Sequence, residues 1–251
     1  MSELVAPQRR INGRTGKKAA QSRLRLALRA VGWALVVAIF GSLVWAGVYR
    51  FAGPPGTMVM LERQIGGAHV RRDWTSIDDI SPHLVRAVIA AEDTRFCLHK
   101  GIDFAAIDKA VDENKRRAKR RGASTISQQT AKNAFLWNGG GWARKGAEAW
   151  FTLVIETLWP KRRVMEVYLN VAEWGDGLFG AEAAAQARFG KSARDLTKQE
   201  AALLAAVLPS PNKWRVNPPG PYVSRRANIL RGRMEQVRRD GLDACVLGVR
   251  R

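Results

Sequence analysis

An uncharged apolar segment near the N-terminus, residues 30–49, constrains the fold more than any other feature. Its 20 residues match the length that an α-helix needs to cross the ~30 Å hydrocarbon core of a bilayer. Trp33, Trp45 and Tyr49 lie toward its ends, where interfacial aromatic side chains are enriched. A cleaved signal peptide and a buried core helix are the alternatives, but the apolar core of a signal peptide is shorter, about 7–15 residues. We therefore expect a retained transmembrane helix.

The tail that precedes this segment is strongly basic. Residues 1–29 contain eight Lys and Arg side chains and a single acidic residue, Glu3. By the positive-inside rule this tail lies in the cytoplasm, and the chain beyond residue 49 lies outside it. A formal net charge of +20 suits polyanionic partners in general, but an extracytoplasmic domain is not expected to bind nucleic acid. We expect lipid head groups and phosphorylated substrates instead.

The rest of the chain divides into a short linker, residues 50–60, and a domain over residues 61–251. Residues 58–65 are predicted to include a short strand. Beyond them the apolar spacing is helical almost throughout, without a series of alternating strands, so a parallel sheet is disfavoured and the class is mainly α. Helix-boundary signals are Ser81-Pro82, capping boxes at Thr125 and Thr197, Pro160 as a start and Gly190 as a stop.

The two cysteines, Cys97 and Cys245, exclude a disulfide-rich scaffold. One bridge would form only in an oxidising compartment, and we expect two buried free thiols. The three histidines show no spacing with the cysteines that would suit a structural zinc site.

The first candidate catalytic residue is Glu92. It continues an apolar stripe that includes Leu84, Val88 and Ile89 at helical spacing. The stripe delivers a carboxylate to the buried edge of a helix, near its C-terminal end. Burial and the negative end of the helix dipole both raise a carboxyl pKa, which suits a general acid or base. A structural role in a local ion pair is the alternative.

A second polar group follows in residues 122–133, GASTISQQTAKN. If Thr125 caps a helix, then Thr125, Gln129, Lys132 and Asn133 share one face. One cation among neutral hydrogen-bonding groups suits a phosphate-bearing or sugar ligand. An ordinary solvated face is the alternative. The Ser, Thr and Gln content, poor for a helix, argues against it.

A third group joins two cations to a carboxylate. Arg144 and Lys145 precede Glu148 by four and three residues, so all three side chains meet on one helix surface. Before it, residues 135–142 form either a loop that dips into a membrane interface or a packed turn. The basic run 115–121 is either a solvated segment or a contact for anionic lipid.

Two motif matches are rejected. Residues 175–180 fit the glycine pattern of dinucleotide-binding folds, but a helical pattern rather than a strand precedes them. Residues 210–213 fit the S-x-x-K of penicillin-binding transpeptidases, but no K-T-G follows.

Taken together, the segments resemble the ordered motifs of the family 51 glycosyltransferases, which are the peptidoglycan glycosyltransferases. The resemblance extends over residues 61–239, and five motifs in the family's order make it specific. The segments are EDTRFCLHKG (92–101), GASTISQQTAKN (122–133), RKGAE (144–148), the run 161–191 and LTKQEAALLAAVLPSPNKW (196–214).

The resemblance implies a lysozyme-like, mainly α fold at the outer face of the bacterial inner membrane, with the N-terminus cytoplasmic and the catalytic domain periplasmic. The implied substrates are lipid II and the growing glycan chain on undecaprenyl pyrophosphate, and cell-wall synthesis or division proteins are candidate partners. No cofactor is expected to be required, although a divalent cation such as Mg²⁺ or Mn²⁺ at Glu148 is a candidate. Glu92 matches the general base and Glu148 the second carboxylate. The substrate-binding candidates are Asp93, Phe96, His99, Ser124, Thr125, Gln128, Gln129, Lys132, Asn133, Arg144 and Lys145.

Two other functions stay open on the residues alone. A lysozyme-like enzyme that cleaves peptidoglycan needs an acid for its alkoxide leaving group, and it has no need of the cations at 132, 144 and 145. A non-catalytic membrane scaffold would depend on the basic run rather than on Glu92.

Overall fold

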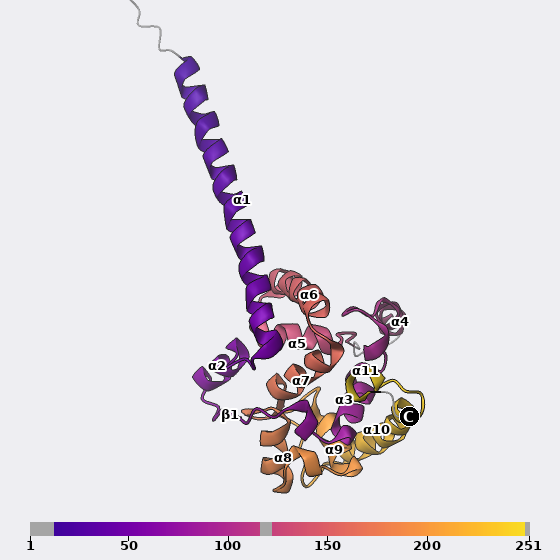
Figure 1. The fold of residues 1–251 in the computed structure, drawn as a ribbon. Helices are drawn as coiled ribbons and strands as arrows, with labels where there is room; N and C mark the ends of the chain where they lie inside the picture. The colour runs from indigo at the N-terminus through magenta and orange to yellow at the C-terminus, as the bar shows by residue number, and fades with distance from the viewer. Residues whose placement is uncertain (1–12, 116–121, 249–251) are drawn as a thin grey trace, which may run out of the picture. The chain divides into compact units, whose positions relative to one another are not determined.

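The computed structural model of the chain describes residues 13–115 and 122–248, and the chain divides into two compact units, Met1–Trp45 and Ala46–Arg251. Helices dominate the described residues (Figure 1). In chain order the elements are α1 (Gly13–Phe51), α2 (Met58–Ile65), β1 (Arg71–Arg72), η1 (Ile77–Asp79), α3 (Pro82–Glu92), η2 (Phe96–Leu98), α4 (Phe104–Asn114), α5 (Ile126–Phe135), α6 (Gly141–Leu158), α7 (Lys161–Val171), β2 (Glu173–Gly175), β3 (Leu178–Phe179), α8 (Ala181–Phe189), η3 (Ala193–Asp195), α9 (Lys198–Val207), α10 (Pro221–Arg239) and α11 (Ala244–Leu247).

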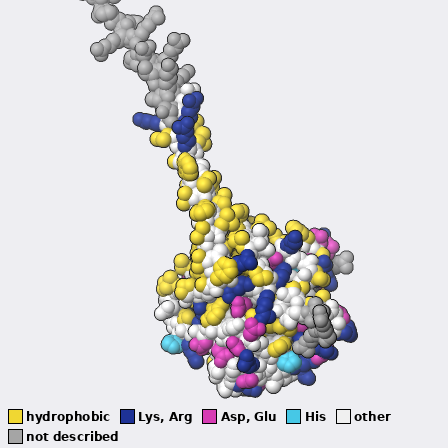
Figure 2. All heavy atoms as spheres, in the orientation of Figure 1, with side chains coloured by type: hydrophobic (Ala, Val, Ile, Leu, Met, Phe, Trp, Pro, Cys, Tyr) yellow, Lys and Arg dark blue, Asp and Glu magenta, His cyan; other side chains and the backbone are white. Residues whose placement is uncertain are grey.

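Helix α1 contains the apolar segment. Its part Arg23–Phe51 has 29 residues and a mean hydropathy of 2.1 over its most apolar window. Among the described residues it is the one helix that is long and apolar enough to cross a membrane. Large apolar side chains along it, such as Trp33 and Phe40, are exposed, and Figure 2 shows hydrophobic side chains along its length below a basic end.

The predicted helix boundaries are confirmed. Thr125 and Thr197 each form a complete capping box, in which the threonine oxygen accepts from a backbone N–H three residues on. The Ser81 oxygen accepts from the His83 N–H ahead of α3. Pro160 precedes α7, and Gly190 ends α8 in the left-handed region with φ +66°.

The prediction of a short strand within residues 58–65 is wrong, because this segment forms helix α2. The Thr57 side chain caps it by accepting from the Met60 N–H. Val59 and Met60 are both buried although they are adjacent, which a helix accommodates and which the alternating sides of a strand do not. The capping threonine is the signal that the prediction missed.

The core of the second unit is built around α3. This helix packs against α9 and α10, while α5 packs against α6 and α7. Leu84, Val88 and Ile89 are fully buried, as the apolar stripe predicted. Small side chains on α9, including Ala201 and Ala205, are also fully buried and let the helices approach closely. Packing thus fixes the C-terminal end of α3, where Glu92 lies.

Three short strands lie beside the helices. β1 pairs parallel with β3, and β2 pairs antiparallel with β3. The glycine-rich residues 175–180 begin on the last residue of β2 and form the turn into β3. The expectation that a helix precedes them directly is therefore wrong, because α7 ends at Val171 and the short strand β2 follows it. A Cβ on Gly177, at φ +69°, would lie 2.4 Å from the His69 carbonyl oxygen. The glycines therefore serve a tight turn between two antiparallel strands, which differs from the strand-to-helix turn of a dinucleotide-binding motif.

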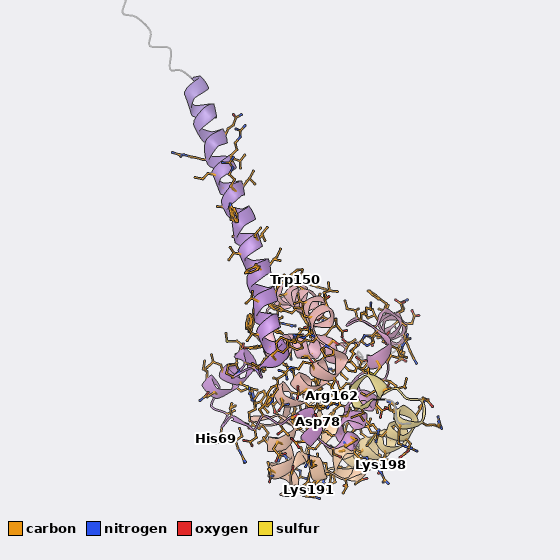
Figure 3. The ribbon with its side chains drawn as sticks, viewed as in Figure 1. His69, Asp78, Trp150, Arg162, Lys191 and Lys198 are labelled. Atoms are coloured by element: carbon orange, nitrogen blue, oxygen red, sulfur yellow. A yellow bond between two sulfur atoms is a disulfide. The ribbon has the colours of Figure 1, made fainter. Side chains whose placement is uncertain are left out.

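Polar contacts fasten α7 to distant parts of the chain. An Arg162 guanidinium nitrogen lies 2.6 Å from an Asp78 carboxylate oxygen of η1, and Figure 3 shows the two labels together near the centre of the unit. A second Arg162 nitrogen donates to the Val246 carbonyl of α11. The last described helix is thereby held against α7.

The prediction of two free thiols is also wrong, since Cys97 and Cys245 form a disulfide across a Cα–Cα distance of 5.6 Å. Arg86 of α3 supports the same region, since its Nε lies 2.6 Å from an Asp243 oxygen in a buried ion pair. Helix α10 runs back along α3 and brings the C-terminal segment to η2. The sequence alone does not show this return, so the 148-residue separation gave no sign of the pairing.

Candidate active site

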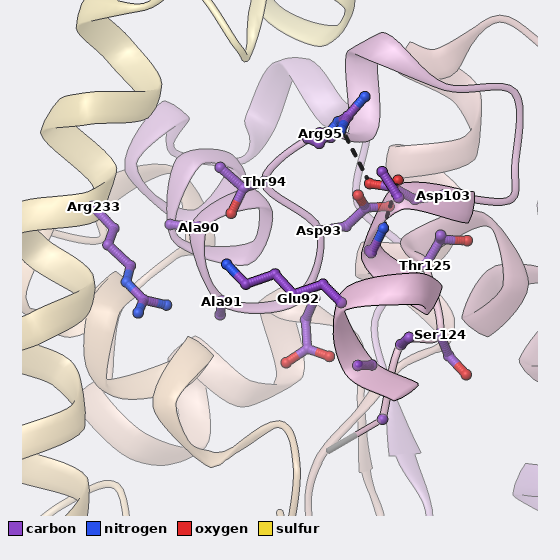
Figure 4. A pocket seen from close by; sticks show the side chains of 16 residues that line it. Ala90, Ala91, Glu92, Asp93, Thr94, Arg95, Asp103, Ser124, Thr125 and Arg233 are labelled. Atoms are coloured by element: carbon purple, nitrogen blue, oxygen red, sulfur yellow. Dashed lines mark hydrogen bonds and ion pairs between the residues drawn. The ribbon is translucent and has the colours of Figure 1, made fainter. Parts of the chain in front are cut away.

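Glu92 ends α3 half-buried in the wall of a cavity of about 450 Å³ (Figure 4). Burial raises the pKa of its carboxyl, and the neighbouring Asp93 charge adds to the rise. A hydrogen bond from Gln129 and the charge of Arg226 oppose that rise without cancelling it. The carboxyl is therefore easier to protonate near neutral pH than an exposed glutamate, as expected for an acid or base.

Gln129 and Tyr168 orient this carboxylate. The Gln129 amide Nε2 donates to Glu92 Oε2 at 2.9 Å. The Tyr168 hydroxyl lies 3.4 Å from the Gln129 amide oxygen, to which it donates. Burial holds the pKa of Tyr168 well above its usual value, so the phenol stays a donor. Tyr168 lies beside Gln129 because α7 packs on α5, a contact between distant helices that no sequence pattern indicates.

Asp93 and His99 support the loop that follows Glu92. His99 Nε2 lies 3.0 Å from both Asp93 oxygens, and the Ile126 N–H donates to Asp93 at 3.1 Å. Asp93 is thereby used twice, as a partner of His99 and as a link to the start of α5. Phe96 is fully buried beneath the Lys161 ammonium, which lies 4.4 Å from the ring centroid. These side chains hold the loop in place, and Asp93 also lines the same cavity as Glu92.

Some polar side chains at the start and along α5 hold the fold together, and others line cavities. Thr125 and Gln128 are buried in the capping box, and the Thr125 hydroxyl also donates to the Gly101 carbonyl. Ser124 is exposed and lines the same cavity as Glu92. Gln129, Lys132 and Asn133 line a second cavity of about 220 Å³. Gln129 connects the two cavities through its bond to Glu92.

Arg144, Lys145 and Glu148 meet on α6, as their spacing predicted. Arg144 Nη1 lies 2.7 Å from one Glu148 oxygen, and the Lys145 ammonium contacts the other. The Glu148 side chain is 4% exposed. Burial lowers the pKa of Lys132, with the charge of Arg144 as the next cause. Arg144 and Lys145 thus share one buried carboxylate, and Lys132 lies close enough for the charges of Glu148 and Glu173 to act on it.

A divalent cation does not fit the residues at Glu148, because both carboxylate oxygens already contact cationic side chains. Asp93, His99 and Asp103 offer another group, with ligand atoms within 4.8 Å of one another. His99 already pairs with Asp93, and Asp103 accepts from the Ala106 N–H as the cap of α4. Neither group is therefore arranged around a metal.

The basic run 115–121 and residues 135–142 are the two remaining segments that the sequence singled out. Most of the basic run, residues 116–121, lies outside the described residues, and Lys115 follows the end of α4. Residues 136–140 connect α5 to α6, and Trp142 in the first turn of α6 is 91% exposed.

Comparison with known proteins identifies the class. The sequence profile of the transglycosylase family matches residues 59–235. The chain belongs to this family and is a glycosyltransferase. The mainly α, lysozyme-like fold predicted from the sequence is confirmed, and so is the family resemblance.

Individual relatives have a more specific name than the family. The chain is 58% identical over 200 residues to the biosynthetic peptidoglycan transglycosylase of Rhodospirillum centenum. This alignment covers 79% of this chain and 87% of the relative. Proteins of the same name from Caulobacter vibrioides and Pseudomonas aeruginosa are 52% and 53% identical. These alignments cover 84% and 78% of this chain, and 92% and 87% of the relatives.

Proposed function

We propose that this protein polymerises lipid II into β-1,4-linked glycan strands of peptidoglycan and releases undecaprenyl pyrophosphate. One observation carries the proposal: a carboxyl group with a raised pKa lines one cavity, and the Gln129 side chain that binds it lines a second cavity together with the cation Lys132. The names of the relatives supply the substrate class, since they are biosynthetic peptidoglycan transglycosylases.

Glu92 is the general base of the proposed reaction. Its ionised carboxylate takes the proton from the 4-hydroxyl of the acceptor N-acetylglucosamine. The oxygen forms a bond to the anomeric carbon of the donor N-acetylmuramic acid, with inversion, as the bond from that carbon to the pyrophosphate oxygen breaks. The raised pKa makes the carboxylate a stronger base, and the Gln129 amide keeps one of its oxygens in place.

The cations on α5 and α6 serve the leaving group. Lys132, Arg144 and Lys145 stabilise the negative charge that develops on the pyrophosphate, so no acid has to protonate it. Glu148 holds Arg144 and Lys145 in position through both of its oxygens. Because the residues at Glu148 do not fit a divalent cation, no step of this reaction is assigned to a metal.

We also propose that the protein is anchored in the bacterial inner membrane by α1, with its N-terminus in the cytoplasm and its catalytic unit in the periplasm. The length and hydropathy of α1 support this, as does the basic tail before it. Exposed aromatic and apolar side chains on α6, namely Trp142, Trp150 and Leu153, suit contact with a bilayer interface. Such a location would bring the site to a lipid-linked substrate.

The test is polymerisation of purified lipid II by the full-length protein in detergent or vesicles. Wild type should make glycan polymer, and Glu92→Gln should reduce the rate by about 10²–10⁴-fold because the base is lost. Glu235→Gln is the matched control, since this exposed glutamate lies on the outer side of α10 and pairs only with Lys198 and Arg238 among the described residues. Release of muropeptides from finished peptidoglycan without polymer from lipid II would identify a cleaving enzyme instead. Equal activity of the two variants would remove Glu92 from the mechanism.

A further inference from the structure

The cavity in front of Glu92 has two cations that belong to neither α5 nor α6. Lys109 of α4 and Arg233 of α10 line it together with Glu92. Figure 4 shows Arg233 extending from α10 toward the side of the cavity where Glu92 lies. Neither Lys109 nor Arg233 has an ion-pair partner within residues 13–115 and 122–248. Two cationic side chains are therefore available to a ligand in this cavity.

Arg226 extends this positive wall along α10. It precedes Arg233 by seven residues, nearly two turns, so both side chains leave the same face of the helix. Its Nε atom is buried and has no hydrogen-bond partner in the described part of the chain. Its charge acts on the carboxyl of Glu92. Arg226 and Arg233 thus place positive charge on one side of α10 next to the proposed base, whereas Met234 and Val237 are buried in the core.

The chemistry of the reaction says which substrate belongs here. The two substrates must approach the base from different sides, because the acceptor oxygen attacks opposite the leaving group when transfer inverts the carbon. Lys132, Arg144 and Lys145 suit the donor's pyrophosphate. The cavity that Glu92 itself lines, with its own cations, is then left for the acceptor. A sugar carries no charge that would call for these cations, but the acceptor's pyrophosphate and its peptide carboxylates do.

Resting on the proposed function, we propose that Arg233 and Lys109 bind an anionic group of the acceptor substrate and thereby place its sugar hydroxyl at Glu92. The shared chemistry is an anionic oxygen group, supplied either by the acceptor's pyrophosphate or by its peptide. Both cations belong to helices that lie outside the five sequence motifs, which is why the motifs alone do not indicate them.

The experiment measures polymerisation by the full-length protein at varied concentrations of lipid II. Arg233→Gln and Lys109→Gln should each raise the KM by about tenfold to a hundredfold, the range expected for losing a charge-assisted hydrogen bond. The acid limb of the pH profile of kcat should stay where it is, because Glu92 is unchanged. Arg231→Gln is the matched control, since Arg231 is an exposed arginine of α10 that does not line the cavity.

A second substrate separates the two sources of the anion. In lipid II with an amidated peptide, the carboxylates are neutral and the pyrophosphate is intact. If wild type then shows the raised KM of Arg233→Gln, the peptide supplies the anion. If Arg233→Gln raises the KM for both substrates equally, the pyrophosphate does. Both results support the cavity as the acceptor site.

The proposal is overturned if Arg233→Gln and Lys109→Gln both keep the KM of Arg231→Gln. Because the two cations lie on different helices, misfolding of one variant leaves the other as a test, and a thermal melt identifies it. Failure of the proposed function would look different, because the wild-type protein itself would then make no polymer from lipid II.

Discussion

Gln129 donates a hydrogen bond from its amide nitrogen to the Glu92 carboxylate at 2.9 Å, across a separation of 37 residues. The Tyr168 hydroxyl fixes which end of the amide faces Glu92, since it donates to the amide oxygen. A chain of three side chains from α7, α5 and α3 thus sets both the direction and the basicity of the proposed base.

Removing this hydrogen bond should move the pH profile. The bond lowers the pKa of Glu92, so Gln129→Met, of similar size but without a donor, should raise that pKa further. The acid limb of kcat/KM should therefore move to higher pH, and the rate near neutral pH should fall about tenfold or more. Tyr168→Phe should shift the limb in the same direction by less, because the amide stays but can turn. A limb that moves to lower pH in Gln129→Met would contradict this account.

Glu92 should cost stability while it serves catalysis. Its pKa in the folded protein lies above the ordinary value of 4.5, so the folded state holds this proton more tightly than the unfolded state. The free energy of unfolding therefore loses this contribution as pH rises from about 4.5 through the folded pKa. Glu92→Gln should raise the melting temperature relative to wild type at pH 7–8 and leave it nearly unchanged at pH 4. A destabilised variant at pH 8 would show that the ionised carboxylate is held favourably.

Replacing Glu148 should affect both folding and rate. Glu148→Gln leaves Arg144 and Lys145 without the buried carboxylate that pairs with both, and it removes a negative charge that acts on Lys132. We expect a loss of about 1–3 kcal/mol in the free energy of unfolding and a fall of about 10²-fold or more in polymerisation. Chemical denaturation and the lipid II assay measure the two effects. Glu113→Gln on α4, an element without these cations, serves as the control, and equal behaviour of the two variants would argue against the assigned role.

The disulfide should make stability sensitive to reductant. Cys97 and Cys245 close a long loop of the chain, and such a bond contributes about 2–4 kcal/mol. Wild type should lose stability to denaturant when dithiothreitol is added, whereas Cys245→Ser should be less stable from the start and indifferent to the reductant. A wild-type midpoint that reductant does not move would mean that the bond adds nothing to stability.

The buried pair Arg86–Asp243 offers a separate test of the same end of the chain. Both side chains are less than one-tenth exposed, so Asp243→Ala leaves an arginine charge buried without its partner. We expect a loss of about 3–5 kcal/mol in the free energy of unfolding. Asp240→Ala is the control, because Asp240 is exposed and pairs only with its neighbour Arg239 in the described chain. If the two variants unfold at the same denaturant concentration, the buried pair does not hold the C-terminal segment.

Sequence patterns predicted those parts of the fold that depend on local spacing. The stripe that ends at Glu92 is a property of one helix, and so is the meeting of Arg144, Lys145 and Glu148, because residues three and four apart share a helix face. The capping boxes at Thr125 and Thr197 are likewise local. These features are all present as expected.

The features that the sequence patterns did not predict depend on contacts between helices that are distant in the chain. Tyr168 reaches Gln129 only because α7 packs on α5, and Arg233 reaches the cavity only because α10 packs on α3. Cys245 meets Cys97 for the same reason. Helix α2 is the exception, since its capping residue Thr57 is a local signal that the sequence itself contains.

The bond between Cys97 and Cys245 also imposes an order on how the enzyme is made. Ribosomes synthesise the chain from its N-terminus, so Cys97 is made 148 residues before its partner Cys245. If the catalytic unit is exported as proposed, the loop after Glu92 cannot be covalently secured until the chain as far as Cys245 has reached an oxidising compartment. Chains that stop short of residue 245 would never acquire this bond, so the bond marks chains that extend at least to Cys245.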